Sequence, residues 1–269
     1  MLQYRSRHLS YLELWFDTPA PPQCAADVDV LCYWQRPQPL PGGSAQPFYT
    51  LLVDLQRAES AIFDGLRRST RANIRRAESR DAIECRVLNE TSPAVRARFC
   101  AAYADFASRR GLSGADANRL HMLAERHMFA LSSASRDDLG AIVFHAYLLC
   151  RGRARLVHSV TVQREAADSG ISHLAGRANR YLHWADIVHF RAHGVHTYDF
   201  GGWYEGHDDK ERLGINEFKE EFGGRVVCEH NGKLPLTWKG TAFMTLQRVV
   251  NRNTAESRRR EESRHAGQP

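Results

Sequence analysis

The sequence predicts an α/β (α+β) fold in which helices flank a mixed sheet. At 269 residues, with 43% hydrophobic and 25% charged residues, the chain has ordinary globular composition and enough material for a buried core. From Gly140 onward the apolar patterning predicts the order strand, strand, helix, strand, helix, strand. In open α/β sheets, a strand end followed by a flexible loop and a helix is where ligands bind.

The N-terminal part, up to about Leu55, is expected to form short strands separated by proline-rich loops. Candidate strands are Tyr11–Phe16, Val28–Trp34 and Phe48–Leu55, with prolines between them. We expect residues 1–135, which also include a basic helix and two further helices, to form a smaller N-terminal subdomain on the side where a substrate would bind.

The basic helix is expected over residues 59–80. Its apolar stripe has helical spacing and consists of Ile62, Phe63, Leu66, Thr70, Ile74 and Ala77. Arginines crowd the remaining surface, and two interpretations are open. The helix has either a solvated basic face or a docking surface for a phosphate-bearing substrate, with Arg71 and Arg75 as substrate-binding residues, because guanidinium groups bind phosphate oxygens in a bidentate way.

The next segments predict two helices and a hairpin. Apolar spacing indicates helices over residues 92–111 and, with a cap at Asp116 or Asn118, as far as Leu131. Strands Gly140–Cys150 and Arg155–Val162 follow, joined by a short connection that contains glycine. Residues 136–250 are expected to form the second domain, and residues 251–269 a mobile charged tail.

The most informative stretch runs from Leu174 to Gly224. Apolar residues at helical spacing predict a helix that ends near His193 and Gly194. The run from His196 to Phe200 then suits a short buried strand, which two glycines and a second helix follow.

Charge and cysteine usage narrow the functional class. The net charge of +6 and the pI of about 9.1 favour anionic partners. The six cysteines are widely spaced without a Cys-x-x-Cys pair, which argues against a zinc ribbon and is typical of a reduced, cytoplasmic protein. We expect no signal peptide and no membrane span. His189 and His193 lie one helical turn apart, but no glutamate completes a His-Glu-x-x-His pattern, so no metal is expected.

Three pieces of sequence resemble a known family. They are RRSTRANIRRAE (Arg67–Glu78), ANRYLHWADIVHFRAHGVHTYDFGG (Ala178–Gly202) and GINEFKEEFGG (Gly214–Gly224). Together they resemble the GNAT superfamily of acyltransferases, and more specifically the FemABX-type (BioF2-like, peptidoglycan-bridge) peptidyltransferases. The resemblance implies a GNAT-like mixed sheet in the C-terminal half, with a partial GNAT-like subdomain before it.

The resemblance implies transfer of an acyl group from a phosphate-bearing carrier to a primary amine. The favoured donor is an acyl-CoA, and the acceptor an amino sugar, an amino acid or a cell-envelope precursor. One alternative is a peptidyltransferase that uses aminoacyl-tRNA. Another is a binding module for RNA or a partner protein that has the fold without catalysis.

The resemblance also assigns roles to individual residues. The start of the helix near Leu174 would meet the carrier's phosphates, as helix N-termini do, and Lys219 would face them. The cofactor-binding set is Ala175, Gly176, Arg177, Asn179 and Lys219. The catalytic candidates, which would handle the amine's proton, are Asp199, Glu205 and His207, and the acceptor-pocket candidates are Trp203 and Tyr204. Asp199 has an alternative role in capping the loop that follows it, and Lys219 an alternative role as an ion-pair partner on an exposed helix.

Overall fold

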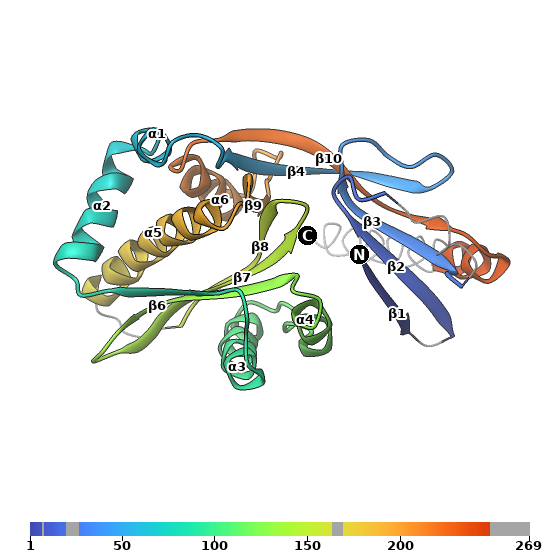
Figure 1. Ribbon diagram of the computed structural model, residues 1–269, viewed down its shortest axis with the longest axis horizontal. Coiled ribbons are helices and arrows are strands. Elements are labelled where there is room, and N and C mark those ends of the chain that lie inside the picture. Colours follow the sequence, from blue (N-terminus) through green and yellow to red (C-terminus); the bar gives the residue numbers. More distant parts are fainter. Residues whose placement is uncertain (7, 20–26, 163–168, 248–269) are drawn as a thin grey trace, which may run out of the picture. The chain divides into compact units, whose positions relative to one another are not determined.

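The computed structural model describes residues 1–6, 8–19, 27–162 and 169–247, and the chain divides into two compact units. The first unit comprises Met1–Pro47 and the chain from Glu229 onward, and the second is Phe48–Cys228 (Figure 1). The domain boundary expected near residue 135 therefore falls inside the second unit. The tail expected over residues 251–269 lies outside the described residues.

Unit 1 is built on a small sheet. Its strands are β1 (Leu2–Ser6), β2 (Leu9–Trp15), β3 (Val30–Arg36) and the later residues of β10 (Arg225–Pro235). The β1–β2 and β3–β10 pairs are antiparallel, whereas β2 and β3 run parallel. Residues 238–247 are helical, and Met244 packs on one face of the sheet against Tyr11, Val30 and Cys32.

Unit 2 contains the larger part of the mixed sheet. Its strand order is β4 (Ser44–Asp54), β9 (Thr197–Gly202), β8 (Arg153–Thr161), β7 (Gly140–Cys150), β6 (Phe129–Arg136) and β5 (Glu84–Leu88). Among these pairs β8–β9 is parallel and the others are antiparallel. This sheet and the helices around it confirm the predicted α/β (α+β) class.

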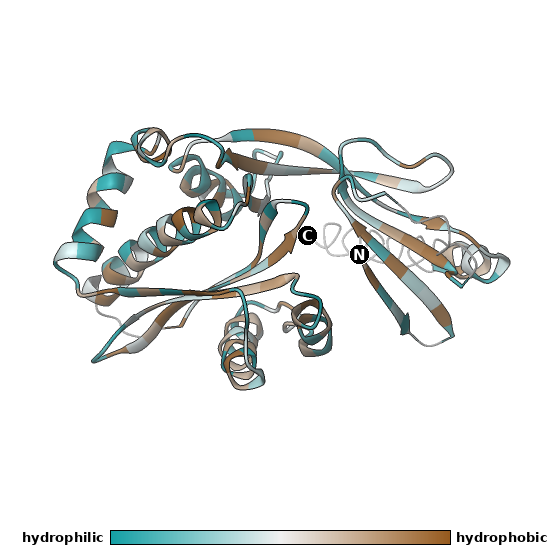
Figure 2. Ribbon diagram, viewed as in Figure 1, coloured by the Kyte–Doolittle hydropathy of each residue, from teal (hydrophilic) through white to brown (hydrophobic). Residues whose placement is uncertain are grey.

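Helices cover both faces of this sheet. They are α1 (Glu59–Asp64), α2 (Arg68–Ser79), α3 (Pro93–Arg109), α4 (Ala117–Ala124), α5 (Ser169–Ala192) and α6 (Lys210–Glu220). In Figure 1, α2 and α5 lie on one face, and α3 and α4 on the other. Figure 2 shows apolar residues along the strands and a largely polar outer surface on α2. Leu174, Ala178 and Leu182 of α5 are buried, which confirms the predicted stripe.

Two predicted helices differ from the structure. The basic helix expected over residues 59–80 is divided into α1 and α2, with residues 65–67 between them. The second helix is shorter than expected. The sequence pattern extended the helix after Asp116 to Leu131, but α4 ends at Ala124 and β6 begins at Phe129. His127 has a φ of 52°, in the left-handed region that a helix cannot contain. Residues 128–131 are apolar and all buried, so their continuous apolar run mimics helical spacing.

Candidate active site

The candidate active site lies where β8 and β9 separate. The two strands pair only from Arg153 to Arg155 of β8, although β8 continues alongside β7 as far as Thr161. A bulge at Val157 of β8 bends that strand, since Leu156 and His158 face consecutive residues of β7. Gly201 has a φ of 72°, and a Cβ there would lie 2.9 Å from the carbonyl oxygen of Leu156. Only glycine therefore lets β9 turn away at this point.

A cavity of about 390 Å³ occupies the space beside the diverging strands. The cavity is lined by residues of β8 and β9, on both sides of the gap between them, and by α5, α6 and the C-terminal part of α3. The lining includes Leu156, Ser159, Asn179, His183, Phe200 and Lys219. Two of the predicted cofactor-binding residues, Asn179 and Lys219, thus lie at one cavity.

Lys219 is buried on α6, with 8% of its surface exposed. Its ammonium group donates hydrogen bonds to the carbonyl oxygens of Gly201 (3.4 Å) and Gly202. Burial lowers the pKa of Lys219 to about 8, while the nearby Asp199 carboxylate acts in the opposite direction. This position excludes the alternative in which Lys219 is an exposed ion-pair partner on the helix surface.

His183 is a cavity residue that the sequence analysis did not select. It lies on α5 within the apolar stripe, and only 1% of its surface is exposed. Its Nδ1 atom is 2.6 Å from the hydroxyl oxygen of Tyr198. Its Nε2 atom has no hydrogen-bond partner among the described residues. Burial lowers the pKa of His183 well below its ordinary value, with the charge of Lys219 acting in the same direction, so the ring is neutral at pH 7.

A chain of hydrogen bonds fixes the tautomer of this neutral ring. Tyr147 donates to Asp186 Oδ2 (2.6 Å), so the Tyr198 hydroxyl, 2.7 Å away, must donate to Tyr147. The Tyr198 oxygen is then the acceptor for His183, whose Nδ1 carries the hydrogen. Burial raises the pKa of both tyrosines well above the ordinary value, so both stay protonated. His183 Nε2 is therefore left with a free lone pair, as the acceptor nitrogen of a neutral imidazole.

Asp186 is the far end of this chain and is completely buried on α5. His145 lies 2.8 Å from Asp186 Oδ2 through Nδ1 and 2.8 Å from the Asn179 side-chain oxygen through Nε2. The ligand-type atoms of His145, His183 and Asp186 lie within 4.8 Å of one another, close enough for a metal ion. In this structure His145 contacts Asp186 directly, and His183 is joined to Asp186 through Tyr198 and Tyr147.

Asp199 points to the other side of β9 and is fully buried and surrounded by donors. Arg153 donates two hydrogen bonds to Oδ2 (3.0 and 2.7 Å), and Thr50 and the backbone N–H of Gly201 donate to Oδ1. Burial raises the pKa of Asp199, but Arg153, Arg155 and these hydrogen bonds outweigh it, so the pKa lies below its usual value. The geometry favours its loop-capping role over proton transfer.

The loop after β9 holds four predicted site residues, none of which lines the cavity. The backbone N–H of Trp203 donates to Tyr49, and Asn216 holds both backbone groups of Tyr204 (3.1 and 2.7 Å). The hydrogen bond with Glu205 is the main cause that raises the pKa of Tyr49 to about 12. His207 is exposed.

The predicted phosphate contacts at Ala175, Gly176 and Arg177 need correction. Helix α5 begins at Ser169, so the N–H groups of residues 174–177 lie within the helix, where they bond to earlier carbonyls. Ala175 is buried in the apolar core with Leu174 and Ala178. The Arg177 guanidinium forms a mostly buried ion pair with Asp81, just after α2. The backbone N–H groups that a helix leaves free for an anion are those of its first turn, which in α5 begins at Ser169 and not at Leu174.

Arg71 and Arg75 lie on α2 and have local partners. Arg71 donates to the carbonyl oxygen of Asp64 (2.9 Å), and the Arg75 guanidinium lies 5.3 Å from the ring centre of Phe63. Neither residue lines the cavity. These contacts are those of the solvated basic face, the first of the two interpretations of this helix.

The site residues that the sequence analysis missed had a recognisable signal. His183 and Asp186 are polar residues three positions apart inside the apolar stripe of α5, where Leu182 and Ile187 are fully buried. A polar side chain on the core-facing stripe of a helix needs an internal partner. The partners, Tyr147 and Tyr198, come from strands far away in sequence, so the network itself requires the fold.

Comparisons with known proteins identify the fold. No protein-family model matches the sequence, and no curated protein matches it either. The structure is similar to FemX (TM-score 0.56, 12% identity), covering 68% of this chain and 61% of that one. It is also similar to L-PGS from Bacillus licheniformis (TM-score 0.53, 12% identity, 92% and 84% covered). A third match is a C-terminal domain assigned to lysylphosphatidylglycerol synthetase in Agrobacterium fabrum (TM-score 0.51, 13% identity, 93% and 83% covered).

The chain therefore has a GNAT-like, FemABX-type fold, as its sequence resemblance implied. It spans about three fifths of the FemX structure. None of the helices in the described part of the chain combines the length and the hydropathy that crossing a bilayer requires.

Proposed function

We propose that this protein is an acyltransferase that moves an acyl group from a phosphate-bearing carrier to a primary amine. The favoured carrier is an acyl-CoA, and the acceptor an amino sugar, an amino acid or a cell-envelope precursor. The observation that carries the proposal is the cavity beside the separated strands, which His183 and Lys219 both line. A carrier bound in this cavity would lie between the separated strands, where His183 can act as a base and Lys219 supplies a positive charge.

In the proposed reaction the neutral amine attacks the carbonyl carbon of the thioester. A C–N bond forms, the C–S bond breaks, and the proton that the amine gives up passes in the end to the departing thiolate. The amine's proton passes to His183 Nε2, the one nitrogen of that ring with a free lone pair. Direct attack needs mainly positioning and general-base help, and no covalent enzyme intermediate.

The hydrogen-bonded chain can hold the amine's proton until the reverse shift returns it through His183 Nε2 to the departing thiolate. The forward shift proceeds along the chain as follows. As Nε2 gains a proton, the Nδ1 hydrogen moves to Tyr198, the Tyr198 hydrogen to Tyr147, and the Tyr147 hydrogen to Asp186. Every member except Asp186 ends with as many protons as it had before. A buried imidazolium, which would be costly next to Lys219, is thereby avoided.

Lys219 supplies the positive charge that faces the carrier's phosphates. Its pKa of about 8 means that the charge is present at neutral pH and is lost as the pH rises through 8. Carrier binding should therefore weaken above about pH 8. Asp199, Glu205 and His207 have no part in the proposed proton transfer.

The test combines calorimetry with turnover. Coenzyme A is titrated into the wild type, Lys219→Met and, as a matched control on the exposed face of the same helix, Lys210→Met. We expect saturable binding that only Lys219→Met weakens, by tenfold or more. With acetyl-CoA and a panel of amino sugars, His183→Gln should lower kcat by about 10²–10⁴-fold with little change in KM. Coenzyme A binding that is absent at millimolar concentration would reject this donor.

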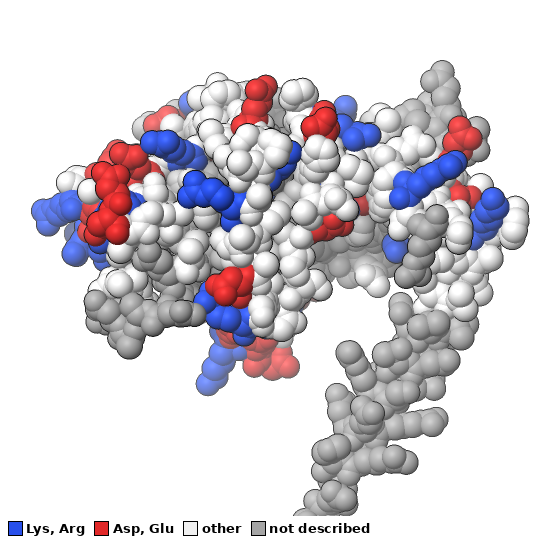
Figure 3. Space-filling view, turned by 90° about the horizontal axis from the view of Figure 1, so that it is seen from below, with Lys and Arg blue, Asp and Glu red and all other residues white. Residues whose placement is uncertain are grey.

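An aminoacyl-tRNA donor is the second candidate, favoured by the fold similarity to FemX and L-PGS. On the face shown in Figure 3, however, Lys and Arg are interspersed with Asp and Glu instead of forming one continuous basic surface. Binding of tRNA should fall steeply between about 50 and 200 mM salt, whereas binding of coenzyme A should fall less. If neither donor binds, the fold serves as a binding module.

A further inference from the structure

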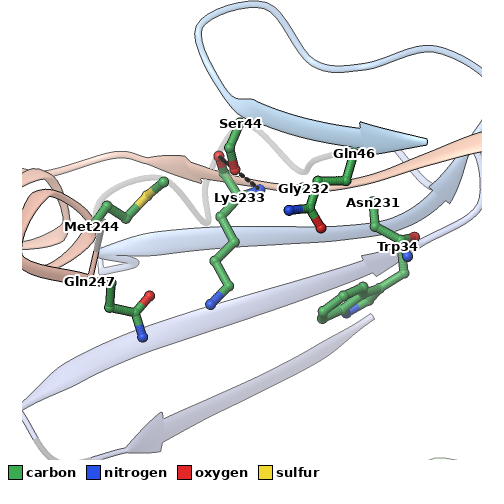
Figure 4. Close-up of a pocket in the computed structure, with 8 residues that line it drawn as sticks. All are labelled: Trp34, Ser44, Gln46, Asn231, Gly232, Lys233, Met244 and Gln247. Atoms are coloured by element: carbon green, nitrogen blue, oxygen red, sulfur yellow. Dashed lines mark hydrogen bonds between the residues drawn. The ribbon is translucent and has the colours of Figure 1, made fainter. Parts of the chain in front are cut away.

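Unit 1 contains a pocket of its own, of about 380 Å³, at the edge of its small sheet. Residues from β3, β10, the start of β4 and the C-terminal helix line it (Figure 4). The lining includes Trp34, Gln46, Asn231, Lys233, Met244 and Gln247. None of these residues was used in the proposed acyl transfer.

The backbone that carries the pocket's lysine is held rigidly. The Ser44 hydroxyl accepts a hydrogen bond from the N–H of Lys233 (3.1 Å), and the Tyr33 hydroxyl donates to the Ser44 carbonyl oxygen (2.5 Å). At Gly232 a Cβ would lie 1.9 Å from the Ser44 carbonyl oxygen and 2.3 Å from the Tyr33 ring. The close approach of the strands requires glycine here and fixes the direction in which Lys233 leaves β10.

The pocket gathers hydrogen-bond donors and one positive charge. Figure 4 shows Lys233 extending toward the amide of Gln247, with the amide of Gln46 and the ring of Trp34 on its other side. Lys233 is half-buried and forms no ion pair or hydrogen bond through its ammonium group with any described residue. The side-chain oxygen of Asn231 accepts from the N–H of Gln35 (2.8 Å), which leaves its amide hydrogens for another acceptor.

No carboxylate is among the described residues that line this pocket. A lysine with amide donors around it and no acid to neutralise it is a surface that complements an anion. The apolar side of the pocket is firm, since Met244 is buried and Trp34 packs on Trp15 with ring centres 5.8 Å apart. A flat or apolar group can lie against this side.

We propose that this pocket binds a small molecule that carries a phosphate or carboxylate group. Lys233 contributes the charge, the amides of Gln46, Asn231 and Gln247 contribute hydrogen bonds, and Trp34 with Met244 receives the apolar part. Phosphate and carboxylate share this chemistry, and the volume suits a ligand of metabolite size. The site shares no lining residue with the acyl-transfer cavity in unit 2.

The experiment is a calorimetric titration of the full chain with inorganic phosphate, glutarate and glutaramide. Glutaramide has the shape of glutarate without its charge. We expect saturable binding of phosphate or glutarate below about 10 mM, and the tighter of the two identifies the anionic group. Lys233→Met keeps the aliphatic stem and should weaken binding at least tenfold. Gln46→Leu, at an exposed position, should weaken it several-fold.

Lys239→Met is the matched control, an exposed lysine in the same unit that does not line the pocket. It should bind as the wild type does. The proposal is overturned if no anion saturates, if glutaramide binds as well as glutarate, or if Lys233→Met binds like Lys239→Met. Because the readout is binding without turnover, these outcomes do not depend on the acyl-transfer proposal.

Discussion

Tyr198 and Asp199 are neighbours on β9, and their side chains enter two buried polar networks of different kinds. The Asp199 network is closed, since Arg153, Thr50 and the Gly201 N–H saturate the carboxylate. The Tyr198 network is open at one end, since it runs from Asp186 through Tyr147 and stops at His183, a cavity residue whose Nε2 has no hydrogen-bond partner among the described residues. Alternation along a strand is what sends two adjacent residues to opposite faces.

The difference between the two networks indicates which buried polar groups can take part in a reaction. A buried charge whose bonding capacity is filled stabilises the fold but has nothing to offer a substrate. A buried chain with a free acceptor at a cavity can accept a proton and pass it on. Sequence motifs do not distinguish the two, because Asp199 and His183 both lie in the family-like piece Ala178–Gly202.

The largest expected effect comes from opening the closed network. Asp199→Asn removes the negative charge from a buried Arg153 and should lower the free energy of unfolding by about 3–5 kcal/mol, because an uncompensated buried charge remains. Urea denaturation at pH 7 measures this loss. Asp208→Asn, at an exposed position, serves as the control and should change the free energy by less than about 0.5 kcal/mol. An equal loss of unfolding free energy in the two variants would contradict the conclusion that Asp199 neutralises a buried Arg153.

Lys219 gives a second test, because its lowered pKa makes the free energy of unfolding depend on pH. Its folded-state pKa of about 8 lies below its ordinary value of 10.5, so the unfolded chain binds more protons between those pH values and stability rises with pH there. The wild type should gain about 3 kcal/mol relative to Lys219→Met between pH 7 and 10.5. Lys210→Met should show no such pH-dependent difference. A constant difference for Lys219→Met would mean that its ammonium group is not held in a desolvated site.

Interrupting the open network should have a smaller effect on stability and a distinct effect on rate. Tyr198→Phe leaves the His183 Nδ1 hydrogen without an acceptor and should lower the free energy of unfolding by about 1–3 kcal/mol. The proton path is also cut, so kcat should fall about 10–100-fold while the donor KM stays unchanged. Tyr204→Phe, outside the cavity, is the control. A fall in stability without any loss of kcat would show that the chain serves the fold alone.

Much of the fold was predictable because periodicity reports burial. The stripe of α5, the β7–β8 hairpin and the turn after β9 follow from local patterns, and only glycine fits the turn at Gly201. The start of α5 was misplaced by five residues, because the polar run from Ser169 to His173 carries no apolar period. The end of α4 was placed too late for the opposite reason, because the continuous apolar run that includes Phe129 has apolar residues at helical spacing.

The site was predictable only in part, since its residues meet through long-range packing. Lys219 and Asn179 were selected from the family-like phrases, and both line the cavity. Arg177 was selected because it lies at the expected start of the helix, but its partner Asp81 is 96 positions earlier, and no local pattern reveals that ion pair. His183 had a local signal, as a polar residue in an apolar stripe, but its hydrogen-bonded connection to Tyr198 and Tyr147 could be recognised only from the fold.

The smallest expected effect extends the comparison to the surface. Arg71 and Arg75 contact Asp64 and Phe63 on the solvated side of α2, and surface contacts of this kind contribute about 0–1 kcal/mol each. Reversing both charges, as Arg71→Glu and Arg75→Glu, should therefore lower stability by about 1 kcal/mol at most and leave the acceptor KM unchanged. Steady-state kinetics with the best acceptor measures this. A severalfold rise in KM would restore the phosphate-docking interpretation of the helix and show that the exposed cations, and not the cavity alone, select the acceptor.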